Sequence, residues 1–320
     1  MAEAPALKYH KLFNPPRSVE PPSKEATEAG DQRRTVAYVY GDEKIVLAVN
    51  VALATQRPLL VRGPSGTGKS SLALSVADFL GWRFYEYVVT SRTQARELLW
   101  QVDLLRRLHD AQSPRRRLAE GYVPYVVPGV LWWAFDEAGA RAQRSRSTSG
   151  PSLLRGRDPN LGRPHERAVV LIDEIDKADP DTPNNLLVPL GSLQFQVEET
   201  GQLVQTAPQR APLLIITTND ERELPQAFLR RCVELRLEYP GREWLLEIGR
   251  VQLPELDEGL RTAVADALLG PKDSKPTVSA AEYVDALRGC KQLQIAAGTP
   301  AFEQLLASTI WKHGRKGPGK

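Results

Sequence analysis

The stretch PLLVRGPSGTGKSSLALSVADFLG, residues 58–81, decides the fold class of this protein. Its short apolar run at 59–61 predicts a strand buried on both faces. A glycine-rich loop follows, and beyond it apolar residues between 72 and 80 recur at helical spacing until Gly81 ends the helix. Strand character resumes in WRFYEYVV, residues 82–89, so the whole segment predicts a βαβ unit.

The loop at 63–70 satisfies the pattern G-x-x-x-x-G-K-[ST] in the strand-to-helix context that this pattern requires. Its glycines let backbone N–H groups turn inward around phosphate oxygens, and the start of the helix adds a partial positive charge. Lys69 would neutralise the β- and γ-phosphates of ATP, and the Ser70 hydroxyl would ligate Mg²⁺. The alternative is a glycine-rich tight turn, but the context and a second motif both favour phosphate binding. The residues expected to hold the nucleotide are Gly63, Pro64, Ser65, Gly66, Thr67, Gly68, Lys69, Ser70 and Ser71.

An acidic pair, the second motif, closes the apolar run AVVLI at 168–172. A buried strand there would deliver Asp173 and Glu174 to the carboxyl edge of a parallel sheet, where ligands of such sheets bind. Asp173 would hold Mg²⁺, directly or through water, and Glu174 would orient and deprotonate the attacking water. The alternative is a solvated acidic turn that ends a strand. Asp176 and Asp179, in the charged turn that follows, are interpreted as surface caps.

Two further features lie downstream of the acidic pair. The run LLIITTND, residues 213–220, predicts a buried strand whose end would place Asn219 beside the γ-phosphate or the attacking water. Asparagine is also a common turn residue, which is the alternative. The segment AFLRRC, residues 227–232, puts Arg230 and Arg231 at the end of a short helix. A guanidinium aimed at a transferring phosphoryl group raises the rate about 10³- to 10⁵-fold, although two arginines on a helix are usually a solvated face.

The rest of the chain divides by composition into regions of different character. Residues 1–35 are rich in proline and charge and predict a flexible arm. An α/β domain with about five strands is expected over 36–240, with a basic insertion at 141–167. Helical spacing between Pro and Gly signals predicts a small helical domain over 241–313, followed by a basic tail at 314–320.

Composition also limits the class of protein and its compartment. With 320 residues and 42% apolar side chains, the chain has enough material for a sizeable core. Cys232 and Cys290 are its two cysteines and form no CxxC pair, which favours a reducing compartment and argues against a disulfide framework. No apolar run reaches the length of a signal peptide or of a membrane span. These features predict a soluble, cytoplasmic protein with no membrane partner.

Overall charge gives no reason to expect nucleic-acid binding, since 42 basic side chains stand against 39 acidic ones. Basic residues gather locally, in the insertion at 141–167 and in RRLHDAQSPRRR at 106–117. Such segments can bind phosphate backbones, but no aromatic residues are interleaved here for base stacking. The favoured interpretation of the insertion is a solvated loop, too polar to pack, and nucleic-acid binding is the alternative.

Taken together, these residues resemble one family strongly: the AAA+ ATPases, and within them the MoxR-like group. The resemblance runs from about residue 36 to the C-terminal helix. Besides the phosphate loop and Asn219 it covers VYGDEKIV (39–46), VPGVLWWAF (127–135), VVLIDEID (169–176), FQVEETGQLVQ (195–205) and LRRC (229–232). VPGVLWWAF looks like the family's PGPL segment in an insert of the second helix, and FQVEETGQLVQ looks like the hairpin that precedes the sensor strand.

The resemblance implies a P-loop AAA+ core with a parallel five-stranded sheet flanked by helices, plus a small C-terminal helical lid. It implies ATP and Mg²⁺ as ligands, with the adenine base of ATP near Val39, Tyr40 and Gly41. It also implies a homo-oligomeric ring, usually a hexamer, in which Arg230 or Arg231 reaches the γ-phosphate of the neighbouring subunit. Family members act as chaperone-like remodellers, often beside a partner with a von Willebrand A domain, and some belong to bacterial multi-gene conflict systems.

One departure from the family concerns the lid. The family usually carries an SPR motif there whose arginine senses the nucleotide, and this chain has Thr299, Pro300 and Ala301 at the matching place. Arg288 is a candidate substitute, and an exposed helix charge is the alternative. Three functions stay open: an ATP-driven remodeller of a protein partner, an ATP-gated switch with little turnover, and a motor subunit of a nuclease complex. The chain lacks the NKxD motif for guanine and the LSGGQ signature of transporter ATPases, which favours ATP.

Overall fold

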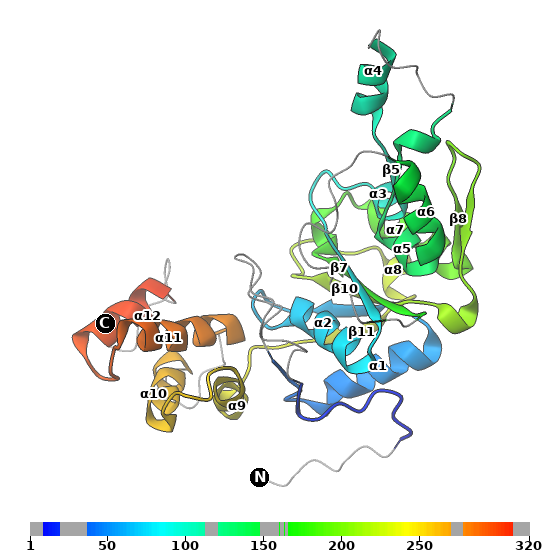
Figure 1. Cartoon of the computed structure of the whole chain (residues 1–320). Coiled ribbons are helices and arrows are strands. Elements are labelled where there is room, and N and C mark those ends of the chain that lie inside the picture. The colour runs from blue at the N-terminus through cyan, green and yellow to red at the C-terminus, as the bar shows by residue number, and fades with distance from the viewer. Residues whose placement is uncertain are drawn as a thin grey trace. The chain divides into compact units, whose positions relative to one another are not determined.

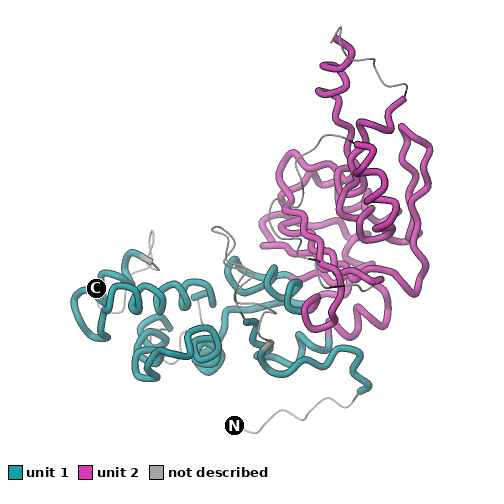
Figure 2. The backbone as a smooth tube through the Cα atoms, in the orientation of Figure 1, with its two compact units in different colours: residues 1–47, 62–75, 235–320 teal, residues 48–61, 76–234 magenta. Residues whose placement is uncertain are grey.

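The computed structural model (Figure 1) describes residues 9–19, 37–112, 121–147, 160, 163, 166–269 and 278–309. The chain forms two compact units, each built from segments that lie far apart in the sequence (Figure 2). Unit 1 contains residues 1–47, 62–75 and 235–320, and unit 2 contains residues 48–61 and 76–234. Each unit has its own hydrophobic core.

A five-stranded sheet with the order β11-β3-β10-β7-β4 carries the α/β fold (Figure 1). Its strands are β3 (Leu59–Arg62), β4 (Arg83–Val88), β7 (Ala168–Asp173), β10 (Leu213–Thr218) and β11 (Val233–Arg236). β7 pairs in parallel with both of its neighbours, with Val169 opposite Phe84 on one side and Leu213 on the other. Every residue of β7 and β10 is buried, which explains their continuous apolar runs. The predicted fold class, a P-loop α/β fold with additional C-terminal helices, is confirmed.

Unit 2 also contains helices and two antiparallel hairpins. Its helices and 3-10 turns are α3 (Ala95–Leu99), α4 (Leu104–Gln112), η2 (Val123–Tyr125), α5 (Val130–Phe135), α6 (Glu137–Arg146), η3 (Ile175–Lys177), α7 (Asp181–Ser192), η4 (Pro208–Arg210) and α8 (Gln226–Leu229). β5 (Trp100–Val102) pairs with β6 (Val126–Pro128), and β8 (Gln194–Gln196) pairs with β9 (Leu203–Gln205). The second pair is the hairpin expected from FQVEETGQLVQ, so that prediction is confirmed. Two more helices, α1 (Glu43–Thr55) and α2 (Lys69–Leu80), contribute residues to both units.

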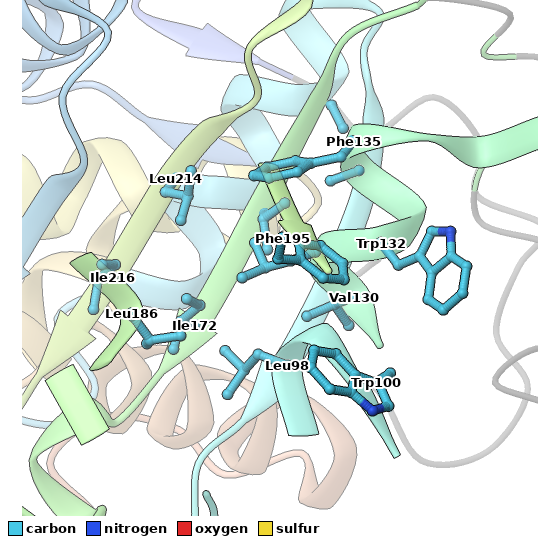
Figure 3. Packing of buried hydrophobic residues seen from close by; sticks show 14 of the residues in the cluster. Leu98, Trp100, Val130, Trp132, Phe135, Ile172, Leu186, Phe195, Leu214 and Ile216 are labelled. Carbon is cyan, nitrogen blue, oxygen red and sulfur yellow. The ribbon is translucent and has the colours of Figure 1, made fainter. Parts of the chain in front are cut away.

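Aromatic side chains from three elements meet in the core of unit 2 (Figure 3). The ring of Phe195, on β8, stacks on that of Trp100 with centroids 5.8 Å apart, and lies 6.3 Å from Trp132 and 6.0 Å from Phe135. Trp132 is fully buried and the other three side chains nearly so. Aromatic pairs of this kind stabilise by about 0.5–1.5 kcal/mol each beyond their buried area. Phe195 therefore holds the β8–β9 hairpin to the segment that contains β5 and α5.

Phe195→Ala is expected to lower the free energy of unfolding of unit 2 by about 3–5 kcal/mol, because it empties the centre of this cluster. Urea unfolding followed by tryptophan fluorescence measures the loss. Leu203→Ala is the matched control, since Leu203 lies on the partner strand and is 53% exposed; its effect should stay within about 0.5 kcal/mol. Equal effects of the two substitutions would contradict the role assigned to Phe195.

The helices of the C-terminal region form the core of unit 1. They are α9 (Arg242–Gln252), α10 (Glu258–Leu269), α11 (Ala280–Leu293) and α12 (Pro300–Thr309). Apolar side chains at helical spacing, among them Leu245, Val264, Tyr283, Leu287 and Leu306, are buried between them. Val39 of β2 (Tyr38–Val39) belongs to the same core.

Part of the predicted N-terminal arm packs on unit 1. β1 (Ser18–Val19) pairs in antiparallel with β2, and the fully buried ring of Phe13 lies 5.7 Å from that of Tyr40. Arg17 adds an ion pair with Glu247 of α9 at 2.6 Å. This part of the arm packs because the apolar Phe13 ring is buried. The proline-rich composition of the surrounding segment gives no sign of that burial. Residues 1–8 and 20–35 of the predicted arm lie outside the described residues.

Two further expectations concern membranes and cysteines. Among the described helices, none has the length and apolar content needed to cross a membrane. Cys232 and Cys290 are buried free thiols, as the lack of a disulfide framework predicts. Burial raises the pKa of Cys232 to about 12 and also raises the pKa of Cys290. Both thiols are therefore protonated at neutral pH and are unsuited to nucleophilic catalysis.

Candidate nucleotide-binding site

The glycine-rich loop joins the end of β3 to the first residue of α2, Lys69, in the context that the sequence predicts. Gly63, Gly66 and Gly68 have φ angles of 145°, 76° and 90°, a region that side chains rarely adopt. At Gly63 a Cβ atom would also lie only 2.2 Å from the carbonyl oxygen of Leu237. The backbone conformation therefore favours glycine at all three positions, and at Gly63 the lack of space requires it as well.

Lys69 lies folded into this loop. Its side chain is 6% exposed, and its Nζ donates to the carbonyls of Gly63 and Pro64, both at 2.8 Å. The Thr67 hydroxyl closes the loop by donating to the same Pro64 carbonyl at 2.9 Å. Backbone N–H groups of such a loop and the adjacent ammonium both suit phosphate oxygens, so the residues present fit a nucleoside triphosphate.

The candidate base-binding residues lie beside the loop in unit 1. The ring of Tyr38 comes within 3.3 Å of a Cβ built on Gly68, and the Tyr40 hydroxyl is 2.9 Å from the Ser75 hydroxyl on α2. Val39 and Tyr40 are buried by protein contacts, whereas Gly41 is exposed and backs onto the Trp244 ring of α9. Of the three residues predicted to lie near the adenine base, Gly41 is therefore the one that is exposed to solvent.

The N-terminus of α11 contacts the phosphate loop directly, a feature that sequence reasoning missed. The Ala281 N–H donates to the Gly66 carbonyl at 3.3 Å, and a Cβ on Gly66 would lie 2.7 Å from Ser279 Oγ. Ser279 and Glu282 form a capping box at this helix end. The S-x-x-E spacing predicts the start of the helix, but nothing local predicts that the helix meets the loop.

Thr299 and Pro300, which the resemblance to the MoxR-like group aligns with its SPR motif, lie at the start of α12. The Thr299 hydroxyl accepts from the Phe302 N–H at 3.2 Å, and Pro300 occupies the first position of the helix. These are ordinary helix-start roles. Arg288, the candidate substitute, lies on α11 within 3.9 Å of Asp285.

In unit 2 the acidic pair closes β7, as predicted. Asp173 is 7% exposed and accepts a hydrogen bond from the Thr217 hydroxyl of β10, which in turn accepts from the Glu174 N–H at 2.9 Å. Glu174 has a φ of 60°, a strained value for a residue with a side chain and one that often marks functional sites. Thr217 was missed by sequence reasoning, because only the parallel pairing of the strands brings it to the acidic pair.

Both carboxylate oxygens of Glu174 are engaged. Asn219 donates from Nδ2 to Oε1 at 3.3 Å, and Lys177 donates from Nζ to Oε2 at 2.6 Å. The hydrogen bond to Glu174 raises the pKa of Lys177 above its usual value. Asn219 thus lies where the sequence predicts, at the end of the neighbouring strand, and its amide touches the candidate general base.

Asp176 does not lie on the surface, so its interpretation as a surface cap is wrong. It is 3% exposed and accepts from the N–H groups of Asn219 and Glu221, at 3.2 and 3.0 Å. It thereby fixes the loop that follows β10. Asp179, by contrast, is exposed and accepts from the Asp181 N–H at 3.1 Å at the start of α7, as predicted.

A surface pocket of about 380 Å³ opens beside Glu174. Its lining consists of Val88, Val89, Thr90, Ser91, Glu174, Asp176, Lys177, Glu221 and Arg222. Arg230 and Arg231, the candidate arginine pair, follow the short helix α8 and are both exposed. They are flanked by Phe228 and Cys232, which are buried in the unit 2 core.

The described ends of the basic insertion pack on the protein, so the prediction that the insertion is too polar to pack is wrong for these residues. Arg163 forms an ion pair with Asp78, and Asn160 accepts from the Phe84 N–H at 2.6 Å. The Arg167 guanidinium lies 3.9 Å from the centre of the Trp82 ring, and burial lowers its pKa. A planar guanidinium group can pack against an aromatic ring or pair with a carboxylate, so a polar composition does not exclude packing.

The basic cluster at 106–117 also contacts aromatic residues where it is described. Arg107 lies 3.7 Å from the centre of the Tyr122 ring, and Arg106 lies 5.4 Å from that of Tyr125. These arginines are thus used in packing, which weakens the case for nucleic-acid binding at this cluster. Residues 113–117 of the cluster and 148–159, 161–162 and 164–165 of the insertion lie outside the described residues.

Comparison with known proteins places the chain in a family. Residues 58–232, more than half of the 320, match the family model described as AAA domain, dynein-related subfamily. A search of curated proteins found no match. Similar solved structures include RuvB of Thermotoga maritima, a Holliday junction branch migration motor. Its sequence is 16% identical to this chain, and the TM-score is 0.44. The match covers 83% of this chain and 67% of the RuvB chain. A point mutant of the same protein is 15% identical with a TM-score of 0.46, covering 83% of this chain and 68% of its own.

This structural similarity to RuvB says nothing about the function of this chain. The family match agrees with the observed order of strand, phosphate loop, helix and acidic pair. The chain therefore belongs to the AAA domain family, in its dynein-related subfamily.

Proposed function

We propose that this protein binds ATP with Mg²⁺ and hydrolyses it to ADP and phosphate. The observation that carries the proposal is the buried Lys69 ammonium inside a loop of three glycines with positive φ, at the start of α2. Such a loop presents backbone N–H groups and a positive charge to phosphate oxygens. The acidic pair supports the same function, because it ends another strand of the sheet and ligands bind where parallel strands end.

The residues present also fit Mg²⁺. Mg²⁺ is usually bound by one or two protein oxygens together with phosphates and water, and a hydroxyl and a carboxylate are oxygen donors of that kind. We assign the Ser70 hydroxyl and the Asp173 carboxylate as its protein ligands. When bound, the ion would neutralise charge on the β- and γ-phosphates.

Glu174 is assigned as the general base for the attacking water. Its contact with Asn219 gives that amide the role of orienting the carboxylate. The contact with Lys177 favours a second candidate function, an ATP-gated switch with little turnover, because the Lys177 ammonium occupies a carboxylate oxygen that would otherwise contact the attacking water. Removal of Lys177 would distinguish a restrained enzyme from an intrinsically slow one.

We further propose that the protein acts in the cytoplasm as a homo-oligomeric ring, the hexamer that the resemblance to the MoxR-like group implies. In this arrangement Arg230 or Arg231, both exposed, would complete the nucleotide site of the neighbouring subunit. The resemblance to the MoxR-like group supports remodelling of a protein partner, one with a von Willebrand A domain being the first to test, within a bacterial conflict system.

Light scattering with ATP, with ADP and without nucleotide tests the proposal on wild type and on Glu174→Gln. The variant is expected to bind ATP without hydrolysing it, and ATP should therefore drive it into a closed ring of about six subunits. Wild type should return to smaller species as ATP is consumed. A variant that stays monomeric under every condition would overturn the ring and the role of the arginines, while ATP binding and turnover would still test the nucleotide site.

A further inference from the structure

The turn that carries Arg230 and Arg231 is held by an arginine from a distant part of the chain. Arg57, which lies just before β3, donates from Nε to the carbonyl of Arg231 and from Nη2 to the carbonyl of Cys232, both at 3.1 Å. The same Nη2 donates to the carbonyl of Arg230. One guanidinium therefore binds three consecutive backbone carbonyls.

These carbonyls follow the last turn of α8, where carbonyl groups have no partner further along the helix. A cationic side chain at such an end satisfies them and is electrostatically favourable. Arginine presents its donors in a rigid planar fork, whereas the ammonium of lysine is a compact point charge on a flexible stem. Arg57 is thus suited to fix the orientation of the turn as well as to satisfy its carbonyls.

The turn is anchored on both sides of the arginine pair. Phe228 is fully buried before it, and Cys232 is buried after it, in the same core cluster. The next residue, Val233, donates its N–H to the Pro58 carbonyl at 2.8 Å, immediately beside Arg57. The backbone of the turn is fixed while the side chains of Arg230 and Arg231 remain exposed.

We propose that Arg57 is a positioning residue for this arginine pair. It sets the direction in which Arg230 and Arg231 leave the turn, and so determines whether they reach the nucleotide of the neighbouring subunit. This inference rests on the proposed function, in which the pair acts on a nucleotide held by another subunit. The hydrogen bonds of Arg57 to the described residues go to backbone carbonyls of this turn and not to the phosphate loop, so ATP binding should not depend on it.

Arg57→Ala is expected to lower kcat about 10- to 100-fold, because a shift of about 1 Å in a group that meets the reacting atoms can cost about 10²-fold. The Kd for a fluorescent ATP analogue should change less than about twofold, since the phosphate loop is untouched. Arg57→Lys should recover only part of the rate, because its ammonium cannot reproduce the planar fork of donors. Thr55→Ala is the control: Thr55 is the last residue of α1, two residues before Arg57, and its hydroxyl donates to the Val51 carbonyl within that helix.

Subunit mixing separates positioning from a general loss of structure. Arg57→Ala subunits keep Glu174, and Glu174→Gln subunits keep a properly held arginine pair. Co-expressed rings of the two should therefore hydrolyse ATP well above the sum of the separate variants, because Glu174→Gln subunits complete the sites of their Arg57→Ala neighbours. Wild-type turnover in Arg57→Ala alone would overturn the proposal.

If the first mixture does not regain activity, a second mixture shows whether the role of Arg57 or the role of the arginine pair between subunits is wrong. Subunits with both Arg230→Ala and Arg231→Ala, mixed with Glu174→Gln subunits, test the arginine pair directly. If this mixture regains activity and the Arg57→Ala mixture does not, Arg57 has only a structural role and the inference is wrong. If neither mixture regains activity, the arginine pair does not act between subunits, and the role of Arg57 falls with that part of the proposed function.

Discussion

Lys69→Ala is expected to reduce ATP turnover by about 10²- to 10³-fold or more, the cost of removing one preorganised charge from a site of phosphoryl transfer. The side chain is 6% exposed and lies inside the glycine loop, where its Nζ donates to the Gly63 carbonyl. Affinity for ATP should fall as well, because the ammonium would face the phosphates before and during reaction. Turnover by phosphate release and affinity by equilibrium binding measure the two effects.

The control for this substitution is Lys44→Ala, which removes an exposed lysine of α1. Its turnover should equal that of wild type. The melting temperature of Lys69→Ala should stay close to that of wild type or rise, because the substitution removes a buried charge. Unchanged turnover in a folded Lys69→Ala protein would rule out the phosphate loop as the nucleotide site.

Glu174→Gln is expected to lower kcat by about 10²- to 10⁴-fold, the usual contribution of general acid–base catalysis. Glutamine keeps an acceptor for the Asn219 amide but cannot take a proton or hold the Lys177 ion pair. Binding of ATP should be preserved to within a few fold, since Glu174 contributes nothing to the phosphate loop. The expected signature is therefore a loss confined to kcat.

Glu221→Gln is the matched control, because Glu221 lines the same pocket beside Glu174 but has no assigned role in the reaction. It should leave kcat within about twofold of wild type. A loss of similar size in both variants would indicate that the charge of the pocket matters, and that no single carboxylate is the general base.

The local motifs were predictable from sequence because each depends on residues close together in the chain. The phosphate loop requires a strand, glycines at fixed positions and a helix start, all within 59–70. The acidic pair could be assigned because the apolar run of β7 shows where a buried strand ends. Asn219 follows by the same reasoning from β10.

The errors and omissions share a different cause. Asp176 was interpreted as a surface cap because its neighbours in the sequence are charged, but the loop after β10 covers it. The insertion was judged too polar to pack, since no local signal pairs Arg163 with Asp78, 85 residues earlier. Phe13 lies among prolines, and only the strand pair β1–β2 places it against Tyr40.

The sequence by itself determined the fold class, the positions of the phosphate loop and the acidic pair, and membership of the AAA domain family, because these are encoded in short spacings and in the periodicity of apolar residues. Only the tertiary structure decided which side chains support them. Thr217 reaches Asp173 across 44 residues, Ala281 reaches Gly66, and Arg57 reaches the carbonyls of the arginine turn. These hydrogen bonds depend on which strands pair and how the helices pack. That geometry is set by burial of side chains over the whole chain, and a short sequence pattern contains no information about it.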